Sequence, residues 1–96
     1  MVALGRKSAR RREHEQLISE AIQRLDRISQ DRGVPRNIRR TTTEAIEALR
    51  DENLSHAVRA SKAISILNEV IGDINMPPQT RSEILLIVSI LERIRD

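Results

Sequence analysis

The sequence has no cysteine, phenylalanine, tryptophan or tyrosine among its 96 residues. Without thiols, the chain cannot form disulfides, thiolate metal sites, iron–sulfur clusters or a cysteine nucleophile. Without aromatic rings, it lacks the stacking platforms on which RNA-recognition and OB-type domains hold bases. Any contact with a nucleic acid would therefore depend on phosphates. The sequence also has little that suggests a membrane. Its longest nearly apolar run, Ile84 to Leu91, is far shorter than the roughly 20 residues that span a bilayer. Residues 1–12 contain no apolar core of a secretory signal, so we expect a cytoplasmic protein.

Charge is distributed unevenly along the chain. The net charge is +3, from 17 Lys and Arg against 14 Asp and Glu. Residues 1–12 carry five basic side chains and no acid, namely Arg6, Lys7, Arg10, Arg11 and Arg12. The remainder has 12 basic and 14 acidic side chains, which gives −2. We therefore predict a flexible basic tail at 1–12 on a single domain at 13–96. Such a tail either binds a polyanion or merely solubilises the terminus.

An internal repeat organises the domain. When residues 13–54 are aligned with 55–96, nine of the 42 pairs are identical, including His14/His56, Asp31/Asp73, Pro35/Pro77 and Arg39/Arg81. Each half reads as two helices joined by a turn, because apolar residues recur at the i, i+3, i+4, i+7 spacing of one helical face. The sequence predicts an all-α protein, a four-helix up-down bundle made of two αα-hairpins. We expect helices near 9–31, 35–51, 55–72 and 77–95.

The two hairpin turns predict a shared mechanism. Gly33 and Asn75 suit a left-handed residue that ends a helix, and Pro35 and Pro77 suit the first position of the next helix. Asp31 and Asp73 each precede an arginine by eight residues. We expect each carboxylate to face that arginine across the turn, or to accept backbone N–H groups at the following helix start.

The last helix is apolar over more than half of its circumference, which exceeds the stripe that one partner requires. The favoured interpretation is a helix wedged among the other three. The alternative is an exposed patch that forms a homodimer.

Basic residues beside the first turn form a second candidate site. Arg36, Arg39 and Arg40 fall near the start of the second helix, where cations oppose the helix dipole. With Arg32 they could hold phosphates through guanidinium groups and free helix N–H groups. A solvated charged face is the competing interpretation.

Catalytic and cofactor chemistry is not indicated. The sequence shows no catalytic constellation, no glycine-rich phosphate loop and no di-iron pattern, so we predict no enzyme activity, no cofactor, no metal and no small-molecule substrate. His14 and His56 occupy equivalent positions near helix starts, and two-fold packing could bring them together. Two imidazoles without a third ligand rarely bind zinc.

Three motifs resemble a small, uncharacterised archaeal family of helical proteins of the UPF type. They are VPRNIRR (34–40), AVRASKAISILNEV (57–70) and D-x-N-M-P-x-x-T-R (73–81). The resemblance runs from Gln16 to Arg95 and implies a short helical bundle in an archaeal cytoplasm, with no assigned activity. A Ser-Pro pair often opens the third helix in this family, whereas this chain has Ser55-His56. The arginine-rich extension is longer than usual there.

Two hypotheses of function follow. The first is a non-catalytic module that contacts RNA, a ribonucleoprotein particle or DNA through phosphates, using the tail and the cluster Arg32, Arg36, Arg39 and Arg40. The alternative is a protein–protein or homo-oligomerisation module that uses the apolar fourth helix.

Overall fold

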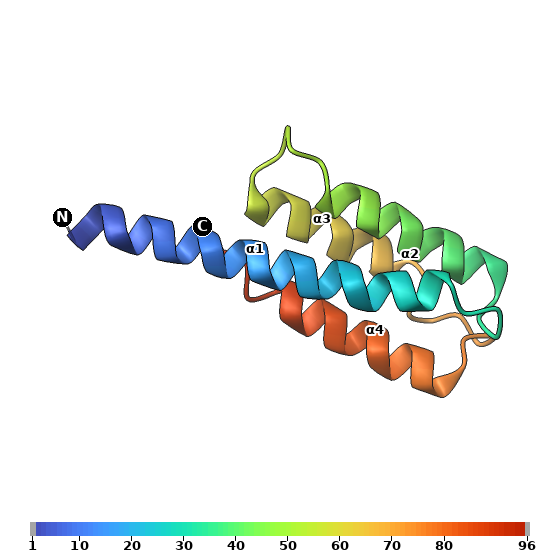
Figure 1. Ribbon diagram of the computed structural model, residues 1–96. Coiled ribbons are helices and arrows are strands. Elements are labelled where there is room, and N and C mark those ends of the chain that lie inside the picture. Colours follow the sequence, from blue (N-terminus) through green and yellow to red (C-terminus); the bar gives the residue numbers. More distant parts are fainter. Residues whose placement is uncertain (1, 96) are drawn as a thin grey trace.

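Four helices form an up-down bundle. The computed structural model describes residues 2–95, with side chains from residue 8 onward. In chain order the helices are α1 (Val2–Ser29), α2 (Arg36–Leu49), α3 (His56–Asn68) and α4 (Pro78–Leu91). Short turns join antiparallel neighbours, and the N-terminal part of α1 extends beyond the other helices (Figure 1). The molecule measures 52 × 23 × 20 Å as a result. The all-α, four-helix prediction is confirmed.

Helix α1 is the longest element of the bundle. Like α3, it contacts each of the other three helices. Its inward stripe is Leu17, Ile18, Ala21, Leu25 and Ile28, all buried. The helix begins at Val2 rather than near residue 9, because alanine, leucine, arginine and lysine near the terminus are good helix formers. The expected tail is therefore helical from residue 2, and its flexibility stays a prediction.

The core is aliphatic and contains side chains from every helix. The large hydrophobic side chains with less than 2% exposure are Leu25, Ile38, Leu49, Leu67, Ile84, Ile87 and Leu91. Fully buried alanines, Ala45 on α2 and Ala63 on α3, leave room for close approach of helices. Aliphatic side chains therefore make up most of the interior, without any Phe, Tyr or Trp ring.

Helix α4 lies at the side of the bundle. It contacts α1 and α3, and among the described residues it makes no contact with α2. The prediction that this helix is wedged among the other three is therefore wrong. The surplus apolar residues of α4 remain outside, because Leu85 and Leu86 are 49% and 43% exposed.

Helices α3 and α4 end about four residues earlier than predicted. After α3, Glu69 N–H and Val70 N–H donate to the carbonyls three residues back. After α4, Arg93 N–H and Ile94 N–H do the same. These i→i−3 bonds tighten each helix end into a turn, which satisfies terminal carbonyls. The buried side chains of Val70 and Ile94 still belong to the core.

The same hydrogen bonds close all three turns between helices. In each turn an aspartate carboxylate accepts the backbone N–H two residues later, at 2.8 Å for Asp31, 3.0 Å for Asp51 and 2.8 Å for Asp73. Its carbonyl accepts the N–H three residues later. Each turn thus matches D-x-[GN]-[VLM]-[PS]-x-x-x-R, at 31–39, 51–59 and 73–81. The turn between α2 and α3 is therefore built like the other two.

The arginine of each turn binds backbone carbonyls rather than the aspartate side chain. Nε of Arg39 donates to Val34 O at 3.0 Å, and Nε of Arg59 donates to Leu54 O at 2.8 Å. Arg81 donates to Ile71 O and, at 2.9 Å, to Asp73 O. The expected Asp–Arg pairing and the helix-start bond are therefore wrong, because the carboxylate is already used inside its own turn.

The helix-ending role predicted for Gly33 and Asn75 is also wrong. Among the described residues none has a positive φ. An aspartate-closed turn supplies the reversal of direction without a left-handed residue. A Cβ at Gly33 would meet Asp31 Oδ1 at 3.1 Å, and asparagines fill the same place in the other two turns. Pro35 and Pro77 lie just before α2 and α4 as N-caps, one residue earlier than expected.

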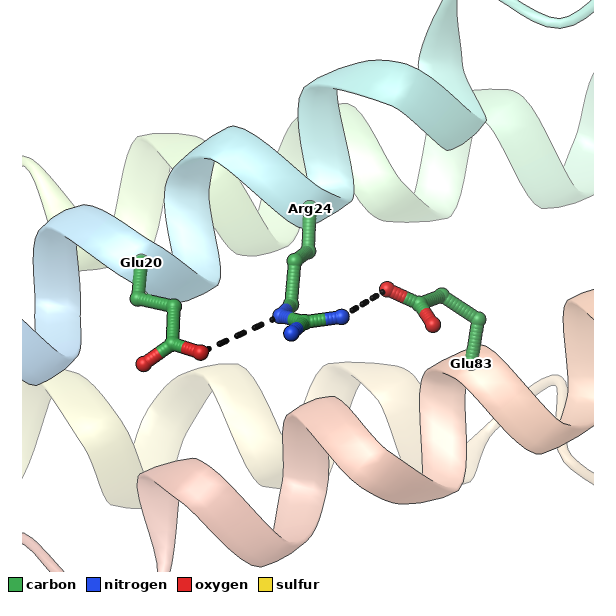
Figure 2. Close-up of polar contacts among 3 residues, drawn as sticks. All are labelled: Glu20, Arg24 and Glu83. Atoms are coloured by element: carbon green, nitrogen blue, oxygen red, sulfur yellow. Dashed lines mark hydrogen bonds and ion pairs between the residues drawn. The ribbon is translucent and has the colours of Figure 1, made fainter.

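An ion-pair network joins α1 to α4. Arg24 donates to Glu83 Oε1 at 2.9 Å and to Glu20 Oε1 at 3.3 Å (Figure 2). The hydrogen bond with Glu83 is the main cause that raises the pKa of Arg24 above its ordinary value. This bridge links α1 to α4 at the surface, while the buried apolar side chains of the two helices belong to the core.

Candidate phosphate-binding site

A change in the inward stripe of α1 marks the candidate site. Proceeding toward the N-terminus, the apolar positions of the stripe are replaced by His14, then Arg11 and Arg10, three and four residues earlier. Residues at this spacing share one helical face. The core therefore ends in a basic surface at the point where α1 leaves the bundle.

The two histidines meet at this point. The ring centroids of His14 and His56 lie 5.9 Å apart, with an edge-to-face angle of 86°. His14 is 9% exposed, and His56 is the first residue of α3. Neither ring makes a hydrogen bond to another described residue. The sequence prediction that packing could bring the histidines together agrees with this geometry.

A pocket of about 380 Å³ opens beside the histidine pair. Three arginines contribute to its wall, two from α1 and one from α3, together with Leu54 and Ser55 at the α2–α3 turn. The lining residues are Arg10, Arg11, His14, Leu54, Ser55, His56 and Arg59. No aspartate or glutamate belongs to this wall. The charged side chains of this wall are therefore all arginines.

The turn motif holds Arg59 in place at the pocket. Its Nε is bound to Leu54 O, while its terminal Nη atoms have no partner in the described part of the chain. Ser55 accepts the Val58 N–H at 3.3 Å and so caps α3. The positive end of the α3 dipole adds to the field of Arg59. The Nε of Arg59 thus stabilises the turn, while its Nη atoms remain available to a ligand.

The pKa of His56 is lowered from its ordinary value of 6.5. Burial is the largest cause, and the positive charge of Arg59 is the second. Arg11 and His14 act in the same direction, whereas Glu15 opposes them. These surroundings therefore favour neutral His56.

Acidic residues near this surface are engaged elsewhere or lie outside the pocket. Glu13 faces Arg93 at 3.6 Å, and both side chains are more than half exposed. Exposed pairs of this kind contribute little to stability. Among the described side chains, no ion pair involves the exposed residues Arg10, Arg11 or Arg12. Their charge is therefore left uncompensated at short range.

The second predicted cluster lies at the other end of the bundle. Arg32 is in the α1–α2 turn, and Arg36 and Arg40 are on α2; all three are exposed. Arg39 is half-buried and engaged with Val34 O. The neighbouring turn meets this end through Asn37, which donates to Asp73 Oδ2 at 2.9 Å. The structure thus separates Arg39 from the other three arginines.

The two basic regions are too far apart to hold one phosphate. At about 1.5 Å rise per residue, the 18 residues from Arg11 to the end of α1 span about 27 Å. Arg6 and Lys7 belong to the helical backbone of α1, but their side chains lie outside the described residues. The tail and the arginine cluster are therefore separate candidate contacts at opposite ends (Figure 1).

Other functional sites find little support in residues 2–95. No group of three or more histidine, aspartate or glutamate residues in this range could hold a metal ion. Within the same range, no helix is long and apolar enough to cross a membrane.

The molecule is, by fold and site, a small aliphatic four-helix bundle with a basic pocket at one end. The chain belongs to the uncharacterised protein family UPF0147, whose model matches residues 5–94. A UPF0147 protein of Metallosphaera sedula is 51% identical over 84 residues, covering 88% of this chain and 94% of the relative. The family resemblance seen in the sequence is confirmed.

Two solved structures share the fold. A crystal structure of a UPF0147 protein from Thermoplasma acidophilum has a TM-score of 0.81 at 33% identity, covering 88% of this chain and 99% of that one. The crystal structure of MMP1188, a protein of unknown function, has a TM-score of 0.81 at 39% identity, covering 83% and 91%. None of these relatives carries an enzyme name.

Sequence reasoning missed the role of Arg59 in this site. It also treated His14 and His56 as helix-start residues. A signal was present, because the third copy of the D…R turn pattern ends at Arg59. When the sequence is aligned with itself at a shift of 42 residues, Asp31 matches Asp73 but Asp51 has no matching aspartate. The three aspartates are 20 and 22 residues apart, so this alignment hides the copy that ends at Arg59.

Proposed function

We propose that this protein is a non-catalytic, cytoplasmic nucleic-acid-binding module that contacts RNA or DNA through backbone phosphates, with the N-terminal half of α1 as its main contact. The observation that carries the proposal is the group Arg10, Arg11 and Arg12. These exposed arginines lie on a helix that projects from the bundle, without ion-pair partners among the described side chains.

Phosphate contact fits the composition of this surface. Arginine forks match phosphate oxygens in pairs, and each neutralised phosphate releases condensed counterions. The chain has no aromatic side chain on which bases could stack. Binding should therefore depend strongly on salt and weakly on sequence.

Arg32, Arg36 and Arg40 would form a second contact at the far end. A nucleic acid reaches both regions only by running along the bundle for about 27 Å, which is about eight base pairs of duplex. Arg39 serves its turn, so the second contact depends on the three exposed arginines.

Two matched triple variants test this proposal. Arg10→Gln/Arg11→Gln/Arg12→Gln and Arg32→Gln/Arg36→Gln/Arg40→Gln each remove three positive charges from exposed positions. Affinity for a 20-base-pair duplex is measured by fluorescence anisotropy at stepped salt. We expect the α1 variant to reduce the slope of log K against log salt by about 2 to 3, and the far-end variant, which removes the second contact, by less than the α1 variant. An unchanged slope in the α1 variant, or equal losses in both, contradicts α1 as the main contact.

A homodimer through α4 is the alternative. It is favoured by Leu85 and Leu86, adjacent residues that are 49% and 43% exposed. Sedimentation at micromolar concentration discriminates, because a strict monomer removes this alternative.

A further inference from the structure

We propose that the pocket between α1 and the start of α3 is a binding site for one phosphoryl group, in which the His14–His56 pair takes up a proton when the anion binds. This inference rests on the proposed function, since it names the place where the nucleic acid would be held. It adds two histidines and Arg59 to the contact, and it makes the affinity depend on pH.

The arrangement of donors supports a phosphoryl ligand. Guanidinium groups reach the pocket from two directions, Arg10 and Arg11 from α1 and Arg59 from α3. The Nε of Arg59 is already fixed by Leu54 O, so its terminal nitrogens approach the pocket from a defined position. A tetrahedral anion offers oxygens to both walls at once, and a volume of about 380 Å³ accommodates it with part of the attached nucleoside.

The histidine pair supplies the link to protons. His14 is more than nine-tenths buried, lines the pocket and has no hydrogen-bond partner among the described residues. Its ring meets His56 edge to face. A positive charge on His56 is disfavoured beside this ring, unless an anion lies between the pair and the solvent. A bound phosphoryl group provides that negative charge, and a proton from water completes the site.

The charges around His56 set the direction of the effect. Those facing it from α1, from α3 and from the end of α2 are Arg11, His14, Glu15, Arg59 and Arg50. Burial is the largest cause that lowers the pKa of His56 in the free protein; Arg59, His14 and Arg11 add to it, and Glu15 opposes them. An anion reverses the balance and raises the pKa on binding. By linkage, a ligand that raises a pKa binds more tightly as the pH falls through that range.

The test measures affinity for a 20-nucleotide oligo(dT) between about pH 5.5 and pH 7.5 at constant salt. Thymine and phosphodiesters do not titrate in this range, and the 3′ dye must be insensitive to pH. We expect the Kd of the wild-type chain to fall about tenfold as the pH decreases, which is the effect of a single group whose pKa rises by about one on binding. His14→Gln and His56→Gln are expected to lose most of this dependence.

Matched arginine variants separate the pocket from general charge. Arg10→Gln/Arg11→Gln is expected to weaken binding at every pH. Arg36→Gln/Arg40→Gln removes the same charge at the far end and should keep the tenfold pH ratio. If both histidine variants keep the wild-type pH dependence, or if wild type has none, the inference is wrong. If wild type binds no oligonucleotide at any pH, the proposed function itself fails.

One further measurement identifies the source of the phosphoryl group, and another tests the inference without any variant that could misfold. The affinities of 5′-phosphorylated and 5′-hydroxyl oligo(dT) are compared. If the phosphorylated form binds several-fold more tightly and inorganic phosphate competes with it, the site binds a terminal phosphate. If the two forms bind equally, the site binds backbone diesters. NMR titration of the histidine ring protons in the wild-type chain needs no variant. The pKa of His56 should rise when oligo(dT) is added, and an unchanged pKa under saturation overturns the inference.

Discussion

The turn between α1 and α2 offers a sharp test of how this fold is held together. Asp31→Ala removes the carboxylate that accepts the Gly33 N–H at 2.8 Å and leaves the backbone bond from Val34 intact. Gly33 is exposed, so water can solvate its freed N–H. The cost is then the net value of one hydrogen bond, about 1 kcal/mol, without the larger penalty of a buried unpaired donor. In a domain of this size that lowers the Tm by about 4–8 °C.

Asp31→Asn is the matched control, because an amide Oδ1 can accept the same bond while the negative charge is lost. We expect the Asn variant to lose less than half of what the Ala variant loses. Asp51→Ala removes the equivalent bond at the other end of α2, about 21 Å away along the helix. The double Ala variant should therefore show the sum of the two losses, about 2 kcal/mol.

Urea unfolding followed by far-UV circular dichroism measures these differences, and oligonucleotide affinity is measured on the same samples. If Asp31→Asn costs as much as Asp31→Ala, charge rather than the turn bond stabilises the helix junction, and the reasoning is refuted. If Asp31→Ala leaves the midpoint unchanged but abolishes binding, Asp31 is a functional residue and its structural assignment is wrong.

Two other predictions concern the core and the pH dependence of stability. Leu25→Ala creates a cavity at a side chain with 0% exposure and should lower the free energy of unfolding in urea by about 3–4 kcal/mol. Leu86→Ala, on the half-exposed face of α4, should lower it by less than about 1 kcal/mol. Similar losses in the two variants would contradict the assignment of the core. The hydrogen bond from Asn37 lowers the pKa of Asp73 below its ordinary 3.8, so this carboxylate stabilises the fold above that pH, and the stabilisation is lost as the pH falls through the lowered pKa. Asn37→Ala should accordingly reduce the loss of urea midpoint between about pH 6 and pH 3, and an identical loss in both proteins would count against the contact.

The sequence predicts the helices well, because four apolar stripes with helical spacing are separated by proline-, glycine- and asparagine-containing turns. It does not predict that α4 lies at the side of the bundle. Leu85 and Leu86 of α4 remain outside, whereas α1 and α3 each contact all three of the other helices. On α1, a narrow stripe with Ala21 and Leu25 at its centre suffices for this packing.

The sequence predicts only part of the candidate site. Arg10 and Arg11 stand out because the first 12 residues contain no acid. Their partner Arg59 lies nearly 50 positions away, and no local pattern connects it to the N-terminus. Only the packing of α1 beside the start of α3 brings the three arginines to one pocket. The same packing turns His14 and His56 from isolated helix-start residues into a contacting pair.

The three-fold use of one turn motif separates structural arginines from those available for function. Arg39, Arg59 and Arg81 each occupy the last position of the motif and bind backbone carbonyls. Of these, Arg59 also lines the basic pocket. The hydrogen bond that holds Arg59 in its turn therefore also places this residue in the wall of the pocket. This part of the wall is in position before a ligand binds. Preorganisation of this kind lowers the entropy lost on binding. It also means that substitution of Arg59 would disturb folding and binding together, so the exposed arginines of α1 and the histidine pair are the residues on which function can be tested separately from the fold.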